Sequence, residues 1–225
     1  MLAVHGELIV VEDLAGAFAD LVVDAFRHRE DEDFCLALSG GPAARQCYEH
    51  LAERGAELID WWQVSVFWAE ERCVPPDHPD SNQLLVRQAL LERVGAANAV
   101  YPMRCTEGPG PYQLRLGEIG NLDLVHLALG PDGHAAGLFV GSTALAADPG
   151  QWVTLSEDPS GRFPHQRMTL TLAGLARARV VVVTVSGADA AEALRAIRGG
   201  ADRPAGRIAA DKVLWLVERD LAPPS

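Results

Sequence analysis

The sequence predicts an α/β fold, a doubly wound and mostly parallel sheet with helices on both faces. Two observations support this class. Short apolar runs alternate with longer segments of helical spacing along the whole chain. The run from Leu122 to Leu129 is apolar except at Asp123 and His126, a pattern typical of a strand buried in a parallel sheet.

The predicted elements follow one another in a regular order. Strands are predicted at residues 4–11, 34–38, 61–69, 100–104, 122–129, 152–155, 167–172, 179–185 and 212–217. Helices are predicted at residues 13–29, 42–54, 82–93, 112–119 and 188–198, with a helical turn at 172–178. The β-branched strand 179–185 is expected to be central, and the tail 222–225 is expected to fray. Because there is no internal repeat or long linker, residues 1–225 are predicted to form a single domain.

The composition limits the classes of partner. The chain has 225 residues, 48% hydrophobic and 22% charged, which is enough for one domain with a sizeable core. Its net charge of -12 argues against nucleic acid and against an anionic membrane surface as partners. The N-terminal segment lacks a signal pattern, and no apolar run approaches the roughly 20 residues that span a bilayer. We expect a cytoplasmic protein that is a monomer or a weak homodimer.

The cysteines point to the same compartment. They are widely spaced and form no CxxC pair: Cys35, Cys47, Cys73 and Cys105. We therefore expect all of them to be reduced thiols, as is usual in the cytosol.

Three predicted strands end in polar segments, and such ends meet at the edge of the sheet where α/β proteins bind ligands. The first segment is Ser39-Gly40-Gly41, which lies between a strand and a helix that begins near Pro42. A loop of this kind can aim backbone N–H groups at an anion. A plain strand-to-helix turn fits it equally well, because the Gly-Lys pair of a Walker loop is missing.

The second segment is Glu70-Glu71-Arg72, and the third is a glycine turn. A charged cluster at a strand end is usually solvated, but this one is followed by the stiff, proline-rich loop 74–82. The turn Gly130-Pro131-Asp132-Gly133 delivers His134 to the carboxyl edge of the predicted sheet. Taken alone, this segment is more simply explained as a turn with a polar residue at its end.

Five blocks of sequence together resemble one family. SGGPAA, FWAEERCVPPDHPDSN, LALGPDGHAAGLF, RMTLT and VSG are similar, in order and spacing, to the 6-phosphogluconolactonases, which belong with the glucosamine-6-phosphate isomerases and deaminases. The resemblance covers about residues 39–218. It implies hydrolysis of 6-phospho-D-glucono-1,5-lactone to 6-phosphogluconate, the second step of the oxidative pentose phosphate pathway. It also implies a small sugar-phosphate lactone as the partner, and neither a metal nor an organic cofactor.

The resemblance assigns roles to individual residues. His134 is implied as the general base that activates water, since a histidine can exchange a proton at neutral pH. Glu70 stands where the family has an aspartate, and its implied role is to orient His134 or a substrate hydroxyl. The other implied substrate-binding positions are Ser39, Gly40 and Gly41 for phosphate, Arg72 and Arg167 as cations, Asn82 in the loop, and Gly130, Asp132 and Gly133 in the turn. Arginine suits phosphate because its planar fork donates two hydrogen bonds, whereas Asn82 fits a purely structural role equally well.

The chain departs from the family pattern at several positions. Hydroxyl-bearing residues of the family are replaced by Ala43, Ala135 and Gly137, and a phosphate-binding lysine is replaced by Ala190. Two other functions therefore stay open. One is an isomerase or deaminase of amino-sugar phosphates, which the loop 74–82 and the GPDGH turn disfavour. The other is a catalytically weakened homologue that binds sugar phosphates or a protein partner.

Overall fold

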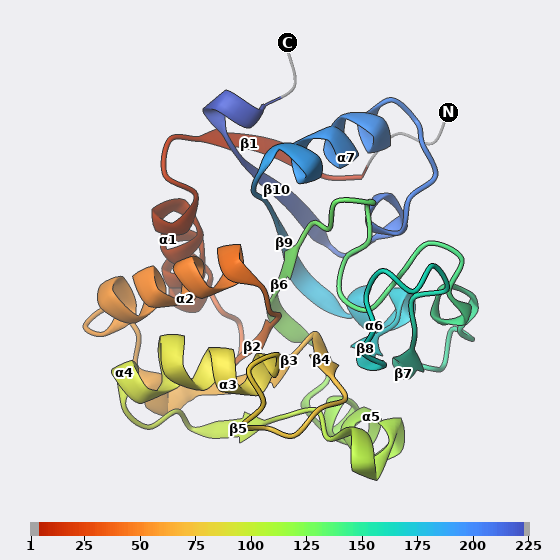
Figure 1. Cartoon of the computed structure of the whole chain (residues 1–225). Helices are drawn as coiled ribbons and strands as arrows, with labels where there is room; N and C mark the ends of the chain where they lie inside the picture. Colours follow the sequence, from red (N-terminus) through yellow and green to blue (C-terminus); the bar gives the residue numbers. More distant parts are fainter. Residues whose placement is uncertain (1–4, 223–225) are drawn as a thin grey trace.

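The large sheet of the protein is entirely parallel. A computed structural model describes residues 5–222, and Figure 1 shows the arrangement of its elements. The sheet has seven strands. Their order across the sheet is β1 (Glu7–Val11), β10 (Lys212–Glu218), β9 (Ala178–Val185), β6 (Leu122–Ala128), β2 (Phe34–Leu38), β3 (Val64–Trp68) and β5 (Ala99–Tyr101). Each neighbouring pair is parallel, as the apolar runs predicted.

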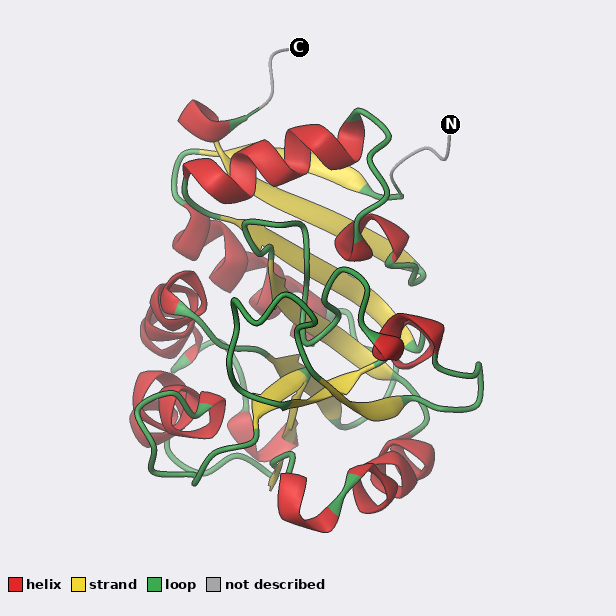
Figure 2. Ribbon diagram, turned by 45° about the vertical axis from the view of Figure 1, so that its right-hand side comes forward, coloured by secondary structure: helices red, strands yellow, loops and turns green. Residues whose placement is uncertain are grey.

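The direction of the chain across this sheet places helices on both of its faces. From β1 to β5 the chain moves toward one edge, and from β5 through β6 and β9 to β10 it moves toward the other. Crossovers between parallel strands are right-handed, so the two halves put their helices on opposite faces. The first face carries α1 (Leu14–Arg27), α2 (Pro42–Gly55), α3 (Asn82–Val86), a π-helical turn (Arg87–Leu91) and α4 (Glu92–Val94). The second carries α5 (Pro109–Ile119), α6 (Leu172–Leu175) and α7 (Ala188–Arg198), and Figure 2 shows the two layers. The predicted doubly wound fold is confirmed.

A second, small antiparallel sheet was not predicted. It contains β4 (Glu70–Arg72), β8 (Arg167–Leu170) and β7 (Val153–Ser156), in that order. The strand expected at 61–69 begins with a 3₁₀ turn (Trp61–Gln63), and β3 ends at Trp68. Ala69 then connects the two sheets, because its N–H donates to Leu38 O at 2.7 Å and its carbonyl accepts from Leu170 N at 2.8 Å. The charged segment after β3 is therefore a strand itself.

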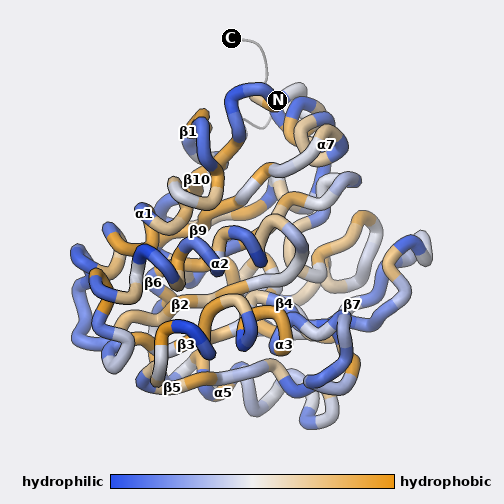
Figure 3. Tube along the Cα trace, turned by 60° about the vertical axis from the view of Figure 1, so that its left-hand side comes forward, coloured by the Kyte–Doolittle hydropathy of each residue, from blue (hydrophilic) through white to orange (hydrophobic). Residues whose placement is uncertain are grey.

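Most other boundaries agree with the sequence patterns. β2 and α7 begin and end at the predicted residues, and β9 is an interior strand next to the middle strand β6. Val4, predicted to begin the first strand, and residues 223–225 of the tail lie outside the described residues. In Figure 3 the strands in the middle of the molecule are largely orange, and the blue segments gather outside them. Within residues 5–222, none of the helices is both long and apolar enough to cross a membrane. Further 3₁₀ turns are Cys105–Glu107, Thr143–Ala146, Pro204–Arg207 and Arg219–Leu221.

The prediction that every cysteine is a reduced thiol is wrong for two of them. Cys73 and Cys105 form a disulfide, with a Cα–Cα distance of 5.4 Å. Cys73 follows β4 and Cys105 follows β5, so it is the fold and not the sequence spacing that brings them together. Cys35 and Cys47 are free and buried, and burial raises the pKa of each thiol to about 12. These two thiols are therefore inert at neutral pH.

Candidate active site

The strand order indicates where a ligand binds. β2 has β3 on one side and β6 on the other, and the chain winds outward from this pair in opposite directions. Such a switch point opens a crevice at the carboxyl ends of the two strands. The glycine loop 39–41 follows β2, and the turn 130–133 follows β6. Two of the predicted polar segments therefore flank the crevice.

The turn after β6 presses the imidazole of His134 against the backbone. Gly130 N–H donates to His134 O at 2.8 Å, which closes the turn. A Cβ atom at Gly130 would lie 2.1 Å from His134 Nδ1, so no other residue fits at this position. The His134 side chain is only 11% exposed. The turn thus holds one nearly buried imidazole at the carboxyl edge.

Asp132 orients this imidazole. Its Oδ1 lies 2.5 Å from His134 Nδ1 and accepts the backbone N–H of His134 at 3.2 Å. Partial burial would raise the pKa of Asp132, but the hydrogen bond and charge of the His134 ring outweigh it and lower that pKa to about 2. Asp132 is therefore a carboxylate that accepts a hydrogen bond from Nδ1–H, which leaves Nε2 of His134 as the free acceptor. The sequence left Glu70 to orient either His134 or a substrate hydroxyl, and in the structure the partner of His134 is Asp132.

The register of β4 on β8 explains the second half of the site. Glu70 lies opposite Thr169 and Arg72 lies opposite Arg167, so these four side chains share one face of the small sheet. Arg167 Nη1 donates to Glu70 Oε2 at 2.5 Å, and both side chains are at least nine-tenths buried. Burial alone would raise the pKa of Glu70, but the charges of Arg167 and Arg72 and the hydrogen bond from Arg167 lower it. Glu70 is thus a fixed carboxylate and is not available as an acid at neutral pH.

Asn82 connects this face to the glycine loop. A Cβ atom at Gly40 would lie 1.8 Å from Asn82 Oδ1, so glycine is required for the close approach. The same Oδ1 accepts from Arg72 Nη1 at 2.7 Å, while Asn82 Nδ2 donates to Glu70 O at 3.0 Å. Arg72 Nη1 also donates to Asp80 O at 2.8 Å. The loop 39–41 and the small sheet therefore form one continuous polar surface.

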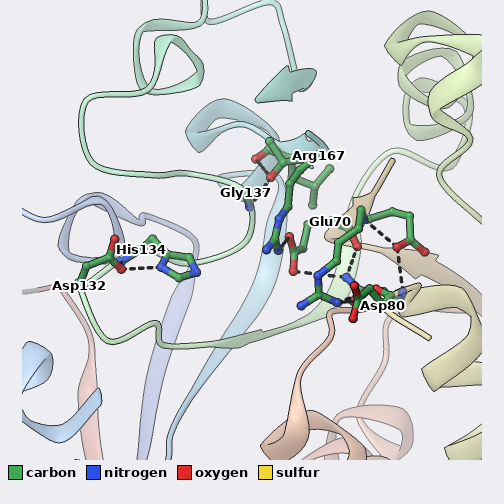
Figure 4. A network of polar contacts seen from close by, with 11 residues as sticks. Glu70, Asp80, Asp132, His134, Gly137 and Arg167 are labelled. Atoms are coloured by element: carbon green, nitrogen blue, oxygen red, sulfur yellow. Dashed lines mark hydrogen bonds and ion pairs between the residues drawn. The ribbon is translucent and has the colours of Figure 1, made fainter. Parts of the chain in front are cut away.

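Phe139 joins the two halves of the site. Its ring centroid lies 5.0 Å from that of His134 and 5.3 Å from Arg167 Cζ. The backbone N–H of Gly137 also donates to Thr169 Oγ1 at 2.9 Å, which ties the His134 loop to β8. Figure 4 shows the His134 ring facing the side where Glu70 and Arg167 lie. The predicted site residues lie on three segments, the loop after β2, the small sheet with its following loop, and the turn after β6: Ser39, Gly40, Gly41, Glu70, Arg72, Asn82, Gly130, Asp132, Gly133, His134 and Arg167.

Two buried polar atoms in this crevice have no hydrogen-bond partner among the described residues. They are Ser39 Oγ, at the start of the glycine loop, and Arg167 Nε. Buried polar groups are nearly always paired in proteins, so an unpaired one calls for an explanation such as a ligand. A hydroxyl and a guanidinium beside a helix N-terminus suit an anionic ligand.

Sequence reasoning missed Glu71, whose role is structural. Glu71 accepts the backbone N–H groups of Arg72, Asn82 and Gln83 at 2.7, 2.8 and 2.7 Å. It thereby closes the loop 73–81 and holds the N-terminus of α3. One feature of the sequence could have indicated this role. Glu71 directly follows Glu70, and in a strand successive side chains point to opposite faces.

A series of buried hydrogen bonds holds the start of the glycine loop, and sequence reasoning missed it as well. Ser39 N donates to Tyr48 Oη at 2.8 Å, and the same hydroxyl lies 2.8 Å from His126 Nδ1. His126 Nε2 lies 3.0 Å from Thr184 Oγ1 on β9. Burial lowers the pKa of His126 to about 3, so the ring is neutral and serves as a hydrogen-bonding spacer. His126 interrupts the apolar run of β6 for this reason.

Comparison with known proteins defines the family. Residues 9–215 match the family model described as glucosamine-6-phosphate isomerases/6-phosphogluconolactonase. A 6-phosphogluconolactonase of Mycobacterium tuberculosis is 32% identical over 208 residues, covering 83% of each chain. A 6-phosphogluconolactonase structure from Trypanosoma cruzi has a TM-score of 0.84 at 23% identity, over 98% of this chain and 97% of that one. A monomeric glucosamine-6-phosphate deaminase shares the fold, with a TM-score of 0.78 at 15% identity over 96% and 98%. The chain belongs to the glucosamine-6-phosphate isomerase/6-phosphogluconolactonase family.

Proposed function

We propose that this chain hydrolyses 6-phospho-D-glucono-1,5-lactone to 6-phospho-D-gluconate, with His134 as the general base. The Asp132–His134 pair is the observation that carries this proposal. A carboxylate that accepts a hydrogen bond from Nδ1 leaves Nε2, the other ring nitrogen, as a proton acceptor. The lactonases among the relatives support the choice of substrate.

The chemistry needs one proton to be moved twice. Nε2 of His134 takes a proton from water while the water oxygen attacks the lactone carbonyl carbon, whose oxygen becomes an oxyanion. The intermediate collapses by breaking the bond between that carbon and the ring oxygen. The imidazolium then returns its proton to the ring oxygen, which leaves a free carboxyl and a free hydroxyl. Asp132 stabilises the imidazolium between the two transfers.

The phosphate is proposed to lie between the glycine loop and the small sheet. The loop 39–41 leads into the N-terminus of α2, which favours an anion. Arg72 and Arg167 stand directly opposite each other in the sheet, whereas Glu70 offsets only one of their charges. Like charges in this position destabilise a sheet, so a phosphate between them would relieve the repulsion. Asn82 aligns Arg72 for this contact.

Other parts of the sequence predictions stay proposals. Gly130 and Gly133 are proposed to act through their backbone, by allowing the close packing of the turn that carries His134. We propose that residues 1–225 work as one domain without a cofactor, as a monomer or a weak homodimer. We propose that the reaction belongs to the oxidative pentose phosphate pathway and that the protein acts in the cytoplasm. The Cys73–Cys105 disulfide removes the argument for that location from reduced thiols.

A coupled assay tests the activity. Formation of 6-phosphogluconate is measured above the uncatalysed rate for the wild type, for His134→Ala and for His50→Ala, which changes an exposed histidine on α2. We expect His134→Ala to lower kcat by about 10²–10⁴-fold and His50→Ala to change nothing. Wild-type activity in a folded His134→Ala protein contradicts the role of this residue. Turnover of glucosamine 6-phosphate in place of the lactone supports the isomerase or deaminase, and turnover of neither supports a binding protein.

A further inference from the structure

The loop 157–166, which joins β7 to β8, lies over the imidazole of His134. Most of its residues are exposed, but Phe163 and His165 are half-buried. Phe163 points inward, and its ring centroid lies 4.7 Å from that of His134 at an interplanar angle of 61°. The mechanism above assigns no part to this ring.

Phe163 completes an aromatic enclosure of the general base. Its ring stacks on Phe139 at 5.5 Å and 20°, and Phe139 itself lies 5.0 Å from the His134 ring. The backbone of Gly130 packs closely against the imidazole. The three rings are mutual neighbours, so the imidazole cannot change its plane without moving a phenyl group.

The loop that carries Phe163 is braced internally and is held at its C-terminal end. Within the loop, Asp158 Oδ2 accepts a hydrogen bond from the backbone N–H of Phe163 at 3.0 Å. On the other side, His165 Nε2 lies 2.9 Å from Asp80 Oδ2 in the loop 73–81. Gln166 O accepts the N–H of Cys73 at 2.8 Å. These contacts join the loop to the segment that carries Arg72, and they fix where the Phe163 ring can lie.

One bond from Asp132 does not orient an imidazole completely. That bond fixes the Nδ1 end of the ring, but the ring can still tilt through small changes of χ1 and χ2. A flat ring against the imidazole restricts this rotation, and it also keeps water away from a base that must act on one water molecule only. We propose that Phe163 is a positioning residue, which holds the His134 ring so that Nε2 faces the lactone. This inference rests on the proposed lactonase function.

Phe163→Leu tests the proposal, with Phe163→Tyr as the conservative variant. Leucine keeps an apolar side chain but removes the aromatic face. We expect Phe163→Leu to lower kcat about tenfold with little change in KM, since an aromatic contact of this kind is worth about that factor. Phe163→Tyr should restore most of the rate. Pro159→Ala, an exposed side-chain change in the same loop, should leave the rate unchanged.

Proton NMR of the histidine ring C–H resonances gives a readout that does not depend on turnover. The His134 resonances are those missing from the spectrum of His134→Ala, and Phe163→Leu should shift them because the neighbouring ring current is lost. Unmoved resonances together with wild-type kcat overturn the proposal. So does a folded Phe163→Tyr protein that loses as much rate as Phe163→Leu. A wild-type protein without lactonase activity instead contradicts the proposed function. The widths of the His134 resonances then decide whether Phe163 holds the ring, because they increase in Phe163→Leu if the ring samples several orientations.

Discussion

The Asp132–His134 pair allows the effect of one substitution on both stability and catalysis to be worked out. Asp132→Asn keeps the shape of the side chain and an oxygen that accepts from His134, but it removes the charge. The pKa of Asp132 falls from the ordinary 3.8 to about 2 in the folded protein. At 1.36 kcal/mol per pKa unit, the pair is worth about 2 kcal/mol. If the carboxylate stabilises the imidazolium formed during the reaction by the same amount, kcat should fall about thirty-fold, with KM little changed.

The stability effect has a defined sign with pH. The pKa of Asp132 is lower in the folded protein than in the unfolded chain. Its contribution is therefore complete above about pH 4 and is lost as the pH falls toward 2. Denaturant unfolding of wild type and Asp132→Asn should differ by about 2 kcal/mol at pH 5, and the two should converge near pH 2. Asp189→Asn, at an exposed position at the start of α7, is the matched control. An unchanged kcat in Asp132→Asn, or a constant difference in stability across this pH range, would refute the reasoning.

Three further predictions concern the small sheet and the loop beside it. Glu71→Gln should lower the free energy of unfolding by about 1–3 kcal/mol, because the amide NH₂ would face one or more of the backbone N–H groups that donate to the Glu71 side chain. An unchanged midpoint of denaturant unfolding would contradict that role. Arg72→Ala should raise KM about tenfold for the 6-phospho-lactone but not for unphosphorylated gluconolactone, with Arg104→Ala as the control. Equal effects on both substrates would mean that Arg72 does not bind the phosphate. Cys73→Ser should lower the free energy of unfolding by about 3–4 kcal/mol, since the disulfide closes a loop between residues 32 positions apart, and reduced wild type should match it. A reductant that leaves the wild-type midpoint unmoved argues against this stabilisation.

The sequence was sufficient for the parts of the fold that depend on local patterns. An apolar run with turn residues at its end defines a buried strand without knowledge of its partners, which is why β2 was placed correctly. The helix α7 was placed correctly because Gly187 precedes it and Gly199 follows it. The convergence of the glycine loop and the His134 turn followed from the parallel sheet alone, since parallel strands end at one edge.

The remaining features depend on contacts between distant segments. The segment after Trp68 reads as a charged strand end, and only its pairing with β8, almost a hundred residues later, makes it a strand. The sequence left open whether Glu70 orients His134 or a substrate hydroxyl for a similar reason. Glu70 forms an ion pair with Arg167 on that neighbouring strand, whereas Asp132 lies two residues from His134 and hydrogen-bonds to its ring. The disulfide and the contact between Phe163 and His134 also join segments that no local pattern relates.

The positions of the charged groups in the site change how the absence of the family lysine at Ala190 is interpreted. Ala190 is 4% exposed, so a long cationic side chain there would start from a packed position on α7. The small sheet instead supplies two arginines opposite each other, and one carboxylate, Glu70, is paired with Arg167. These three side chains carry a net positive charge, which a bound anion would balance. The carboxylate is buried and fixed, so the arrangement fits the binding of an anion. We infer that this chain binds phosphate mainly through side chains of β4 and β8, and less through α7 than the resemblance alone implies.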